Sequence, residues 1–302
     1  MDVPSDFSGV ISIDGDARAY GLAHRGYGIP NTPDTRFAIA SGNKGFTALA
    51  VMSLVEGGEL SLDTRAREVL GDDLPLVDGG VTVEHLLAHR SGIGDYFDED
   101  EHPDINEYVL TRPVHELVDT EDFLPVLDGH PQKFPPGERF AYCNGGYVLL
   151  ALIAQRVSGI SYHDLVHSRV CEPAGMTDTA FLRSDRPEGR TAVGYLSDGR
   201  TNVFHLPVVG NGDGGIYTTA ADIDRFWVAL FAGKIVGDVA RMTRDEHGVG
   251  YGLGFWLPEH GVKLEGYDAG VSFRSVRRDG TTTTVISNTA DGAWPVSRML
   301  GI

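Results

Sequence analysis

The sequence predicts an α+β fold, in which both ends of the chain form β-strands and most of the middle forms helices and long loops. Short segments near both termini alternate in polarity or run apolar, as is typical of strands; they are residues 7–13, 17–24, 251–257, 262–265, 272–277 and 282–287. Between them, residues 61–210 combine helical periodicity with long irregular stretches. The chain has 302 residues, of which 41% are hydrophobic, so it can bury a substantial core as one large domain or as two lobes.

Turn and capping signals support these elements in order. Asp14-Gly15 predicts the turn of a hairpin between the first two strands, and Arg278-Asp279-Gly280 separates the last two. An extended apolar segment at 37–40 leads into the first helix. Ser158-Gly159 is a C-cap signal that ends the second helix. The predicted helices cover residues 46–55, 148–157 and 294–300, of which the first two are amphipathic.

The segment Ser41-Gly42-Asn43-Lys44 places a serine and a lysine one helical turn apart. Residues three apart share a helix face, so the amine can lie beside the serine oxygen. A serine hydroxyl is a weak nucleophile until a base takes its proton, and a lysine amine held away from water can be that base. The same pattern also fits a helix N-cap followed by a surface lysine. Neighbouring motifs favour the catalytic interpretation.

The first of these motifs is Tyr142-Cys143-Asn144, which follows a Pro135-Pro136-Gly137 turn and precedes the second helix. A tyrosine phenol can relay a proton to a leaving group, and an asparagine amide can donate and accept at once. A packed aromatic ring and a helix cap would explain the same residues. Taken alone, this motif leaves both alternatives open.

Two further segments follow the same order along the chain: residues 81–94, VTVEHLLAHRSGIG, and residues 212–226, GDGGIYTTAADIDRF. Together the four segments resemble the serine β-lactamase/penicillin-binding-protein-like superfamily, in the branch that holds class C β-lactamases, D-alanyl-D-alanine carboxypeptidases, D-aminopeptidases and related carboxylesterases. The resemblance covers nearly the whole chain. It implies a single β-lactamase-related catalytic domain over 1–302 with the β-lactamase/DD-peptidase-like fold. Residues 1–60 and 211–302 would build one antiparallel sheet flanked by helices, and residues 61–210 an inserted, mostly helical lobe.

The resemblance also implies roles in acyl transfer. Ser41 would be the acylated nucleophile, Lys44 its base and Tyr142 the partner acid or base. Asn144 would orient the lysine and the substrate carbonyl. The oxyanion hole would consist of the backbone N–H groups of Ser41 and Gly270.

The third motif of this family is Lys-Thr-Gly or His-x-Gly on a strand that lines the site, and the matching stretch here is 266–273. Tyr267 then stands at the basic position and Ala269 at the glycine. A lysine or histidine there helps to bind the carboxylate of penicillins and D-Ala-D-Ala peptides, whereas a tyrosine offers one hydrogen bond and no charge at neutral pH. The predicted substrate-binding residues are Asn144, Tyr267, Asp268, Ala269 and Gly270.

We therefore expect a serine hydrolase that needs no cofactor and acts through an acyl-enzyme on a small ester or amide, of the carboxylesterase type. The alternatives are a β-lactamase or a D-stereospecific peptidase or carboxypeptidase, and, in a different class, a non-catalytic relative that binds a peptide in its cleft. The intact Ser41, Lys44, Tyr142 and Asn144 favour an enzyme. Residues 94–123 and 191–210 carry aromatic side chains and are expected to form walls of the cleft.

No rival signature competes with this interpretation. The sequence has no Gly-x-Ser-x-Gly elbow, no His-Glu-x-x-His and no Cys-x-x-Cys. His85 and His89 lie four apart on a predicted helix, but no third ligand follows at a useful spacing, so we expect a structural role and no metal site. The acidic run 95–101 lacks the regular pattern of a calcium loop and is expected to be a solvated loop.

The net charge of −18 argues against a nucleic-acid partner, because phosphate contacts need a basic patch. No segment reaches the length of a membrane span, and the N-terminus lacks a basic and apolar signal. The alternatives are a cytoplasmic protein and one whose leader has been removed, and we expect the former. Cys143 and Cys171 are the only cysteines, and Cys143 within a functional motif indicates a reducing compartment. The oligomeric state is left open.

Overall fold

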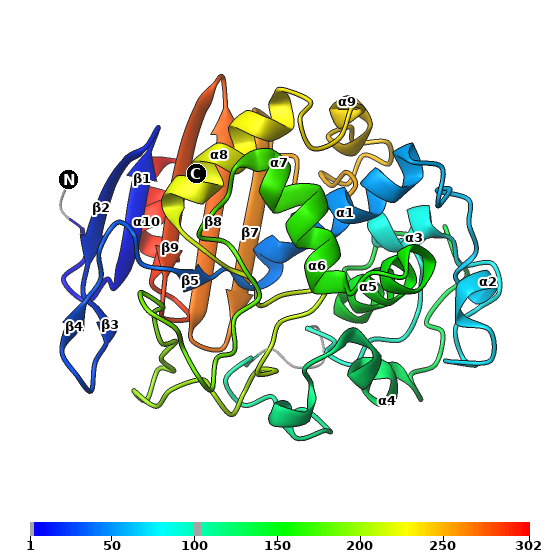
Figure 1. The fold of residues 1–302 in the computed structure, drawn as a ribbon, viewed down its shortest axis with the longest axis horizontal. Coiled ribbons are helices and arrows are strands. Elements are labelled where there is room, and N and C mark those ends of the chain that lie inside the picture. The colour runs from blue at the N-terminus through cyan, green and yellow to red at the C-terminus, as the bar shows by residue number, and fades with distance from the viewer. Residues whose placement is uncertain (1–2, 100–103) are drawn as a thin grey trace.

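Strands from both ends of the chain form one antiparallel sheet, as the sequence predicts. The structure is a computed structural model that describes residues 3–99 and 104–302. The sheet has five strands in the order β2-β1-β9-β8-β7, so the N-terminal hairpin pairs with the C-terminal strands through β1 and β9. Figure 1 shows this sheet on one side of the molecule and most of the helices on the other, which confirms the α+β fold. The five strands are β1 (Gly9–Ile13), β2 (Asp16–Tyr20), β7 (Val262–Asp268), β8 (Val271–Arg278) and β9 (Thr281–Ser287).

Helices and two small ladders make up the rest of the described chain. β3 (Leu22–His24) pairs with β4 (Ile29–Pro30), and β5 (Phe37–Ala38) pairs with β6 (Tyr217–Thr218). The α-helices are α1 (Lys44–Glu56), α2 (Ala66–Leu70), α3 (Val83–Leu87), α4 (Leu124–Leu127), α5 (Asn144–Ser158), α6 (Tyr162–Val166), α7 (Glu172–Ala174), α8 (Ala220–Phe231), α9 (Val239–Met242) and α10 (Ala293–Leu300). The 3-10 helices are η1 (Ala40–Asn43), η2 (Val114–Glu116) and η3 (Thr120–Phe123), and η4 (His167–Cys171) is a π-helix.

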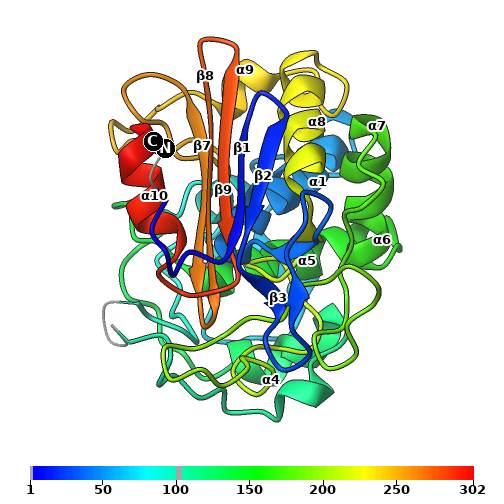
Figure 2. The same ribbon diagram turned by 90° about the vertical axis from the view of Figure 1, so that its left-hand side faces the viewer.

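Helices cover both faces of the sheet (Figure 2). α10 lies on one face, where its buried Ala293 and Val296 pack with Phe7, Ile11 and Val285. α8 lies on the opposite face, and the large core that includes α1 and α5 continues from there. The sequence places the closing helix at 294–300, one residue from its observed start.

Two predicted strands are wrong in detail, and glycine explains both. The segment 17–24 is divided into β2 and β3 at Gly21, whose φ of 68° bends the chain. The segment 251–257 is not a strand; it folds back on itself, with a Gly252 N–H to Phe255 O hydrogen bond of 2.9 Å. Gly254 has a φ of 89°, which allows this reversal.

The helices predicted at 46–55 and 148–157 are observed as α1 and α5, which begin two and four residues earlier than predicted. α5 ends at Gly159, which has the left-handed φ of 68° expected from a C-cap glycine. α1 begins at Lys44 and is buried over most of its surface, including Phe46, Leu49 and Val51. It is therefore a core helix and not the amphipathic helix that the sequence predicts.

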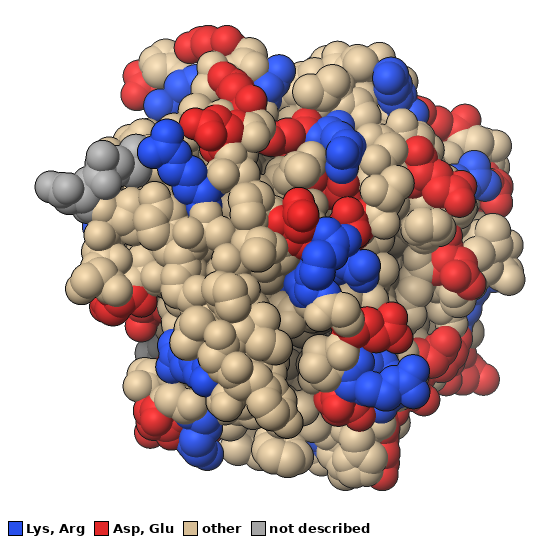
Figure 3. Space-filling model, turned by 60° about the vertical axis from the view of Figure 1, so that its left-hand side comes forward, with Lys and Arg blue, Asp and Glu red and all other residues tan. Residues whose placement is uncertain are grey.

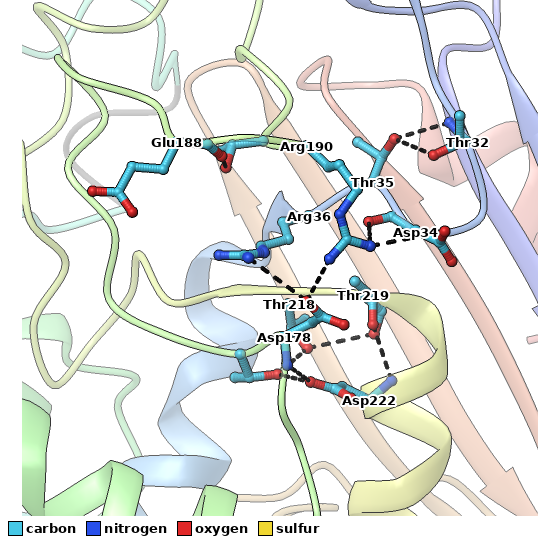
Figure 4. A network of polar contacts seen from close by, with 12 residues as sticks. Thr32, Asp34, Thr35, Arg36, Asp178, Glu188, Arg190, Thr218, Thr219 and Asp222 are labelled. Carbon is cyan, nitrogen blue, oxygen red and sulfur yellow. Dashed lines mark hydrogen bonds and ion pairs between the residues drawn. The ribbon is translucent and has the colours of Figure 1, made fainter.

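A polar network ties the strand that precedes Ser41 to two distant segments (Figure 4). Arg190 contacts the Asp178 carboxylate at 2.6 Å, and Arg36 contacts the same group at 3.6 Å. The backbone N–H of Arg36 donates to Arg190 O at 2.8 Å. The neighbouring Asp222 is fully buried on α8 and accepts hydrogen bonds from Asp178 N and Thr179 Oγ1, each at 2.8 Å. These contacts fix β5, and with it the start of η1.

The surface carries both signs of charge despite the net charge of −18. Figure 3 shows Lys and Arg side chains interspersed with Asp and Glu on the face in view, beside a wide area without charged residues. Within residues 3–99 and 104–302, no helix combines the length and the apolar character needed to cross a membrane.

Candidate active site

Ser41 and Lys44 meet because a 3-10 turn connects β5 to α1. Ala40 has a left-handed φ of 45°, so the chain turns sharply just before Ser41. In the 3-10 geometry of η1, residues three apart eclipse one another. Lys44 Nζ consequently lies 2.8 Å from Ser41 Oγ. The helix caps at η1 and α1 involve no side-chain hydrogen bond from Ser41, so the N-cap alternative does not describe this residue.

The amine of Lys44 is held on three sides by oxygen atoms. Besides Ser41 Oγ, it donates to Asn144 Oδ1 at 2.8 Å and to the backbone carbonyl of Asp213 at 2.9 Å. The Lys44 side chain is only 2% exposed. The rings of Tyr142 and Tyr147 lie 4.9 and 5.8 Å from Nζ and complete its surroundings. The amine is therefore fixed against one hydroxyl, away from bulk water.

Tyr142 contacts the Ser41 hydroxyl as well as the Lys44 amine. Desolvation raises the pKa of its phenol well above the ordinary value, and the Glu99 carboxylate acts in the same direction. A hydrogen bond with Ser41 lowers the same pKa. The phenol therefore keeps its proton at neutral pH and holds it next to Ser41.

His89 supports Tyr142 from behind. Its ring packs against the Tyr142 ring in a tilted arrangement, with 4.3 Å between the ring centroids, and its Nδ1 accepts the N–H of Cys143 at 3.1 Å. Burial, helped by the charge of Lys44, lowers the pKa of His89 well below its usual value, so the imidazole is neutral. His85 forms a capping box with Thr82 at the start of α3, whereas His89 lies beyond the end of that helix. Both histidines thus have the predicted structural role, but they do not share a helix.

Asn144 is the first residue of α5, and the cap of this helix is Cys143, whose Sγ accepts the Gly146 N–H at 3.3 Å. The Asn144 side chain is free to bridge two parts of the site. Its Oδ1 accepts from Lys44, and its Nδ2 donates to Phe97 O and to Glu99 Oε1, each at 3.2 Å. The helix-cap alternative for Asn144 is therefore wrong.

The segment 95–99, expected to be solvated, instead anchors the site. Asp95 is 8% exposed and accepts the N–H groups of Asn144 at 2.6 Å and Gly145 at 2.8 Å. The Tyr96 hydroxyl donates to the carboxylate of Asp213, whose carbonyl holds Lys44. Residues 100 and 101 of the acidic run lie outside the described residues. The acidic sequence 95–101 does not predict that Asp95 anchors the site, because its hydrogen-bond partners are 49 and 50 residues away.

Gly266, and not Gly270, lies against the backbone of Ser41. A Cβ atom added to Gly266 would stand 2.1 Å from Ile39 O and 2.9 Å from Ser41 N. Gly270 lies in the turn between β7 and β8, where an added Cβ would instead stand 2.7 Å from Tyr195 N. Gly270 therefore does not lie beside the backbone of Ser41, and the prediction that its N–H is a donor there is wrong. Ala269 shares this turn and is 1% exposed.

Hydrogen bonding along β7 shows which of its N–H groups points toward Ser41. The N–H and C=O of Lys263 bond to Trp256 at 2.9 and 3.1 Å, on the edge of the strand away from β8. Backbone groups two residues apart on a strand point the same way. The N–H of Tyr267, four residues beyond Lys263, therefore points out of the free edge of the sheet, one residue past the glycine that contacts Ser41.

The position of Gly266 also moves the third motif by three residues. If Gly266 is the glycine of the motif, the lysine or histidine position two residues before it is occupied by Leu264, which is 2% exposed in the core. Neither Tyr267 nor Leu264 offers a positive charge, so the conclusion that this motif lacks a carboxylate-binding cation holds in either register.

Two cavities meet at Ser41. The inner cavity is lined by residues that include Ser41, Asn144, Asp213 and Asp268. The outer groove is lined by residues that include Ser41, Tyr142, Trp256 and Trp294. Glu99 and Tyr267 line both. Residues of both predicted wall segments, 94–123 and 191–210, line the inner cavity, which confirms their placement; residues 100–103 are not part of the described structure.

Among the described residues, no group of three or more His, Cys, Asp or Glu side chains is placed to hold a metal ion. The predicted nucleophile, base, acid and amide are brought together. Sequence reasoning missed the supporting residues Asp95, Tyr96, Glu99, Asp213 and Gly266. Asp213 and Gly266 lie inside segments that the sequence matches to family motifs, 212–226 and 266–273, and the other three lie in the predicted wall segment 94–123.

Comparison with known proteins gives consistent matches. The profile of the Beta-lactamase family matches residues 10–299. The chain is similar to Esterase EstB of Burkholderia gladioli, with 30% identity over 90% of this chain and 82% of that protein. It is similar to Penicillin-binding protein 4* of Bacillus subtilis (strain 168), with 30% identity over 80% of this chain, and it spans 57% of the length of that relative.

Among solved structures, the fold is similar to that of the penicillin binding protein from Bacillus halodurans. The TM-score is 0.92, the sequence identity is 35%, and the match covers 98% of this chain and 97% of that one.

Gly266→Ala should disturb the site through its close contact with Ile39. The added methyl group has no room at 2.1 Å from a backbone oxygen, so β7 or η1 must shift. We expect a loss of stability of about 2 kcal/mol and a fall in turnover of about 100-fold, measured by urea denaturation and by an ester assay. Gly79→Ala is the control, because nothing lies within 4 Å of an added Cβ there. Full turnover in the Gly266 variant would mean that β7 does not set the position of Ser41.

Asp95 should give the protein a measurable pH dependence. Burial raises its pKa from 3.8 to about 6, against the hydrogen bonds from Gly145 and Asn144. Between these values the native state keeps a proton that the unfolded chain loses, so stability falls as the pH rises from about 4 to about 6. The contribution is about 3 kcal/mol.

Urea denaturation between pH 4 and 8 measures this effect. Asp95→Asn should remove it, so the stability difference between the wild type and the variant should change by about this amount over the range. The exposed Asp63→Asn serves as the control. Parallel pH profiles for wild type and Asp95→Asn would contradict the assignment.

Proposed function

This chain belongs to the Beta-lactamase family, and on that basis we propose that it is a serine hydrolase that forms an acyl-enzyme at Ser41 on a small ester or amide. The observation that carries the proposal is the distance of 2.8 Å between Lys44 Nζ and Ser41 Oγ, with the amine buried. The esterase and penicillin-binding protein among its relatives support this class of reaction.

The contacts of Lys44 suit it to take the proton of Ser41. An ammonium has three N–H groups, and here each one faces an oxygen: Ser41 Oγ, Asn144 Oδ1 and Asp213 O. When the amine is neutral, its two remaining N–H groups can stay on Asn144 and Asp213. Its lone pair then lies on the Ser41 hydroxyl, which is the geometry of a general base.

The negative charge that develops during attack needs preorganised donors. Ser41 N–H lies in the first turn of η1, where backbone N–H groups have no partner within the helix. We assign Tyr267 N–H as the second donor in place of Gly270, since it points out of the free edge of β7 next to Ser41. Each such donor contributes about 3–4 kcal/mol to the stabilisation of the transition state.

Tyr142 then acts as the acid that protonates the leaving group. Ser41 Oγ bonds to the carbonyl carbon while its proton passes to Lys44. When the intermediate collapses, the bond from carbon to the leaving oxygen or nitrogen breaks, and Tyr142 gives that atom a proton. The phenol is reprotonated from the Lys44 ammonium. A water molecule then attacks the carbonyl carbon of the acyl-enzyme, with the same proton transfers. The bond from that carbon to Ser41 Oγ breaks, Ser41 regains its proton, and the acid is released.

The charges around Ser41 favour an ester or amide substrate without a carboxylate. The described residues that line the inner cavity include no Lys or Arg. Arg274 in the outer groove is already paired with Glu265. A penicillin or a peptide ending in D-Ala-D-Ala would bring a carboxylate that finds no free cation, which makes the β-lactamase and carboxypeptidase alternatives less suitable.

We also expect the protein to work in a reducing compartment such as the cytoplasm. Cys143 and Cys171 are both buried and free. A disulfide at Cys143 would remove the sulfur acceptor that caps α5 and would disturb Asn144, which is the next residue.

A burst experiment tests the proposal. Incubation with p-nitrophenyl butyrate should release one equivalent of p-nitrophenol before the steady state, with a butyryl adduct on Ser41 seen by mass spectrometry. Ser41→Ala should remove both the burst and the adduct. Ser53→Ala, on the following helix α1 and away from both cavities, is the matched control and should keep both.

Hydrolysis by the wild type no faster than by Ser41→Ala would rule out the acyl-enzyme. Rapid turnover of nitrocefin, or stable labelling by a fluorescent penicillin, would instead favour the β-lactamase or peptidase alternative.

A further inference from the structure

The two cavities at Ser41 differ in which catalytic side chain they contain. Tyr142 lines the outer groove and is absent from the described lining of the inner cavity, whereas Asn144 lines only the inner cavity. In the proposed reaction Tyr142 protonates the leaving group, so the leaving group lies in the outer groove. The acyl group is attached to the other side of the same carbonyl carbon. It therefore extends into the inner cavity.

The ionisable side chains that line the inner cavity are mostly acidic. Asp213, Asp268 and Glu99 all line it, and no Lys or Arg of the described chain does. Lys44 is not among the lining residues, and the three N–H groups of its amine already face oxygen atoms of Ser41, Asn144 and Asp213. His205 also lines the cavity, and desolvation lowers its pKa, so the imidazole does not supply a compensating charge at neutral pH.

Asp268 is the carboxylate best placed to meet a ligand. It stands at the end of β7, one residue after the proposed oxyanion donor Tyr267. One of its oxygens accepts the N–H of Ala269 at 2.9 Å. Burial, together with the charges of Asp213 and Glu99, raises the pKa of this carboxyl to about 7 against the opposing effects of the Ala269 hydrogen bond and the charge of Lys44. Added positive charge in the cavity would relieve this repulsion.

The rest of the wall is polar and aromatic. Asn211 lines the inner cavity and is 2% exposed, and its Oδ1 accepts the Gly212 N–H at 2.7 Å. The wall also includes the rings of Tyr96, Tyr108 and Tyr217, which offer apolar and cation-binding surface.

We propose that the inner cavity binds an acyl group that carries a protonated amine, with the ammonium at the Asp268 carboxylate. The substrates would then be esters or amides of amino acids with a free amino group. This inference rests on the proposed function, because it assumes an acyl-enzyme at Ser41. A neutral acyl group would leave the carboxylates unpaired, and an acyl group with its own carboxylate would be repelled by them.

A matched series of p-nitroanilides tests the proposal at pH 7. The series is alanine p-nitroanilide, which carries the ammonium, its N-acetyl derivative, which is neutral, and its N-succinyl derivative, which carries a carboxylate, each as both enantiomers. We expect kcat/KM to be at least about tenfold higher for the ammonium substrate than for the neutral one, as is typical of a charge-assisted hydrogen bond, and lowest for the carboxylate. Equal or better turnover of the N-acetyl or N-succinyl substrate would overturn the proposal.

The Asp268→Asn variant tests whether Asp268 is the residue that binds the ammonium of the acyl group. The ratio of kcat/KM between the ammonium and neutral substrates should fall by about tenfold in this variant. Because the ratio is taken within one variant, a general loss of activity does not change it. Asp16→Asn, in an exposed ion pair on β2, should keep the wild-type ratio. An unchanged ratio in Asp268→Asn would refute the role of Asp268.

The outcomes for the two hypotheses are separable. If p-nitrophenyl butyrate acylates Ser41 but the three anilides react alike, the acyl-enzyme stands and the amine preference is refuted. If no substrate acylates Ser41, the proposed function itself is refuted.

Discussion

The structure depends on keeping one amine dry and fixed beside one hydroxyl. Burying an ammonium is costly unless oxygen atoms replace the water that it loses. Lys44 meets this requirement with three oxygens from three separate parts of the chain: Ser41, Asn144 and Asp213. Because these oxygens come from η1, from α5 and from the GDGG segment, the position of the amine couples the folding of all three.

The residues that supply two of these oxygens, Asn144 and Asp213, are in turn held in place by further contacts. Asp95 fixes the start of α5 through two backbone N–H groups, and Tyr96 fixes Asp213. On the opposite side, the absence of a side chain at Gly266 lets β7 approach the backbone of Ser41. The site is thus assembled where a strand of the sheet, a core helix and one loop segment meet. The segment 95–99, which holds Asp95 and Tyr96, also supplies Glu99, which lines both cavities.

Local patterns predicted the fold and the central residues, whereas long-range contacts did not emerge from the sequence. Ser41 and Lys44 are three residues apart, so helix geometry alone brings them together. Gly266 and Gly270 lie in one short stretch, and only the contact with Ile39, more than 200 residues away, shows which of them faces the nucleophile. Asp95 looked like part of a solvated acidic run because its buried partners lie on another element. The apolar run at 251–257 resembled a strand, but Gly252 and Gly254 reverse it.

The rate at which a fluorophosphonate probe labels Ser41 tests the central role of Lys44 most directly. Lys44→Met keeps the length of the side chain without its amine, and Lys44→Arg keeps the positive charge but cannot give up a proton. If Lys44 is the base, both variants should label at least about 100-fold more slowly than the wild type, while the exposed Lys234→Met labels normally. A folded Lys44→Met protein that labels at the wild-type rate would contradict the account.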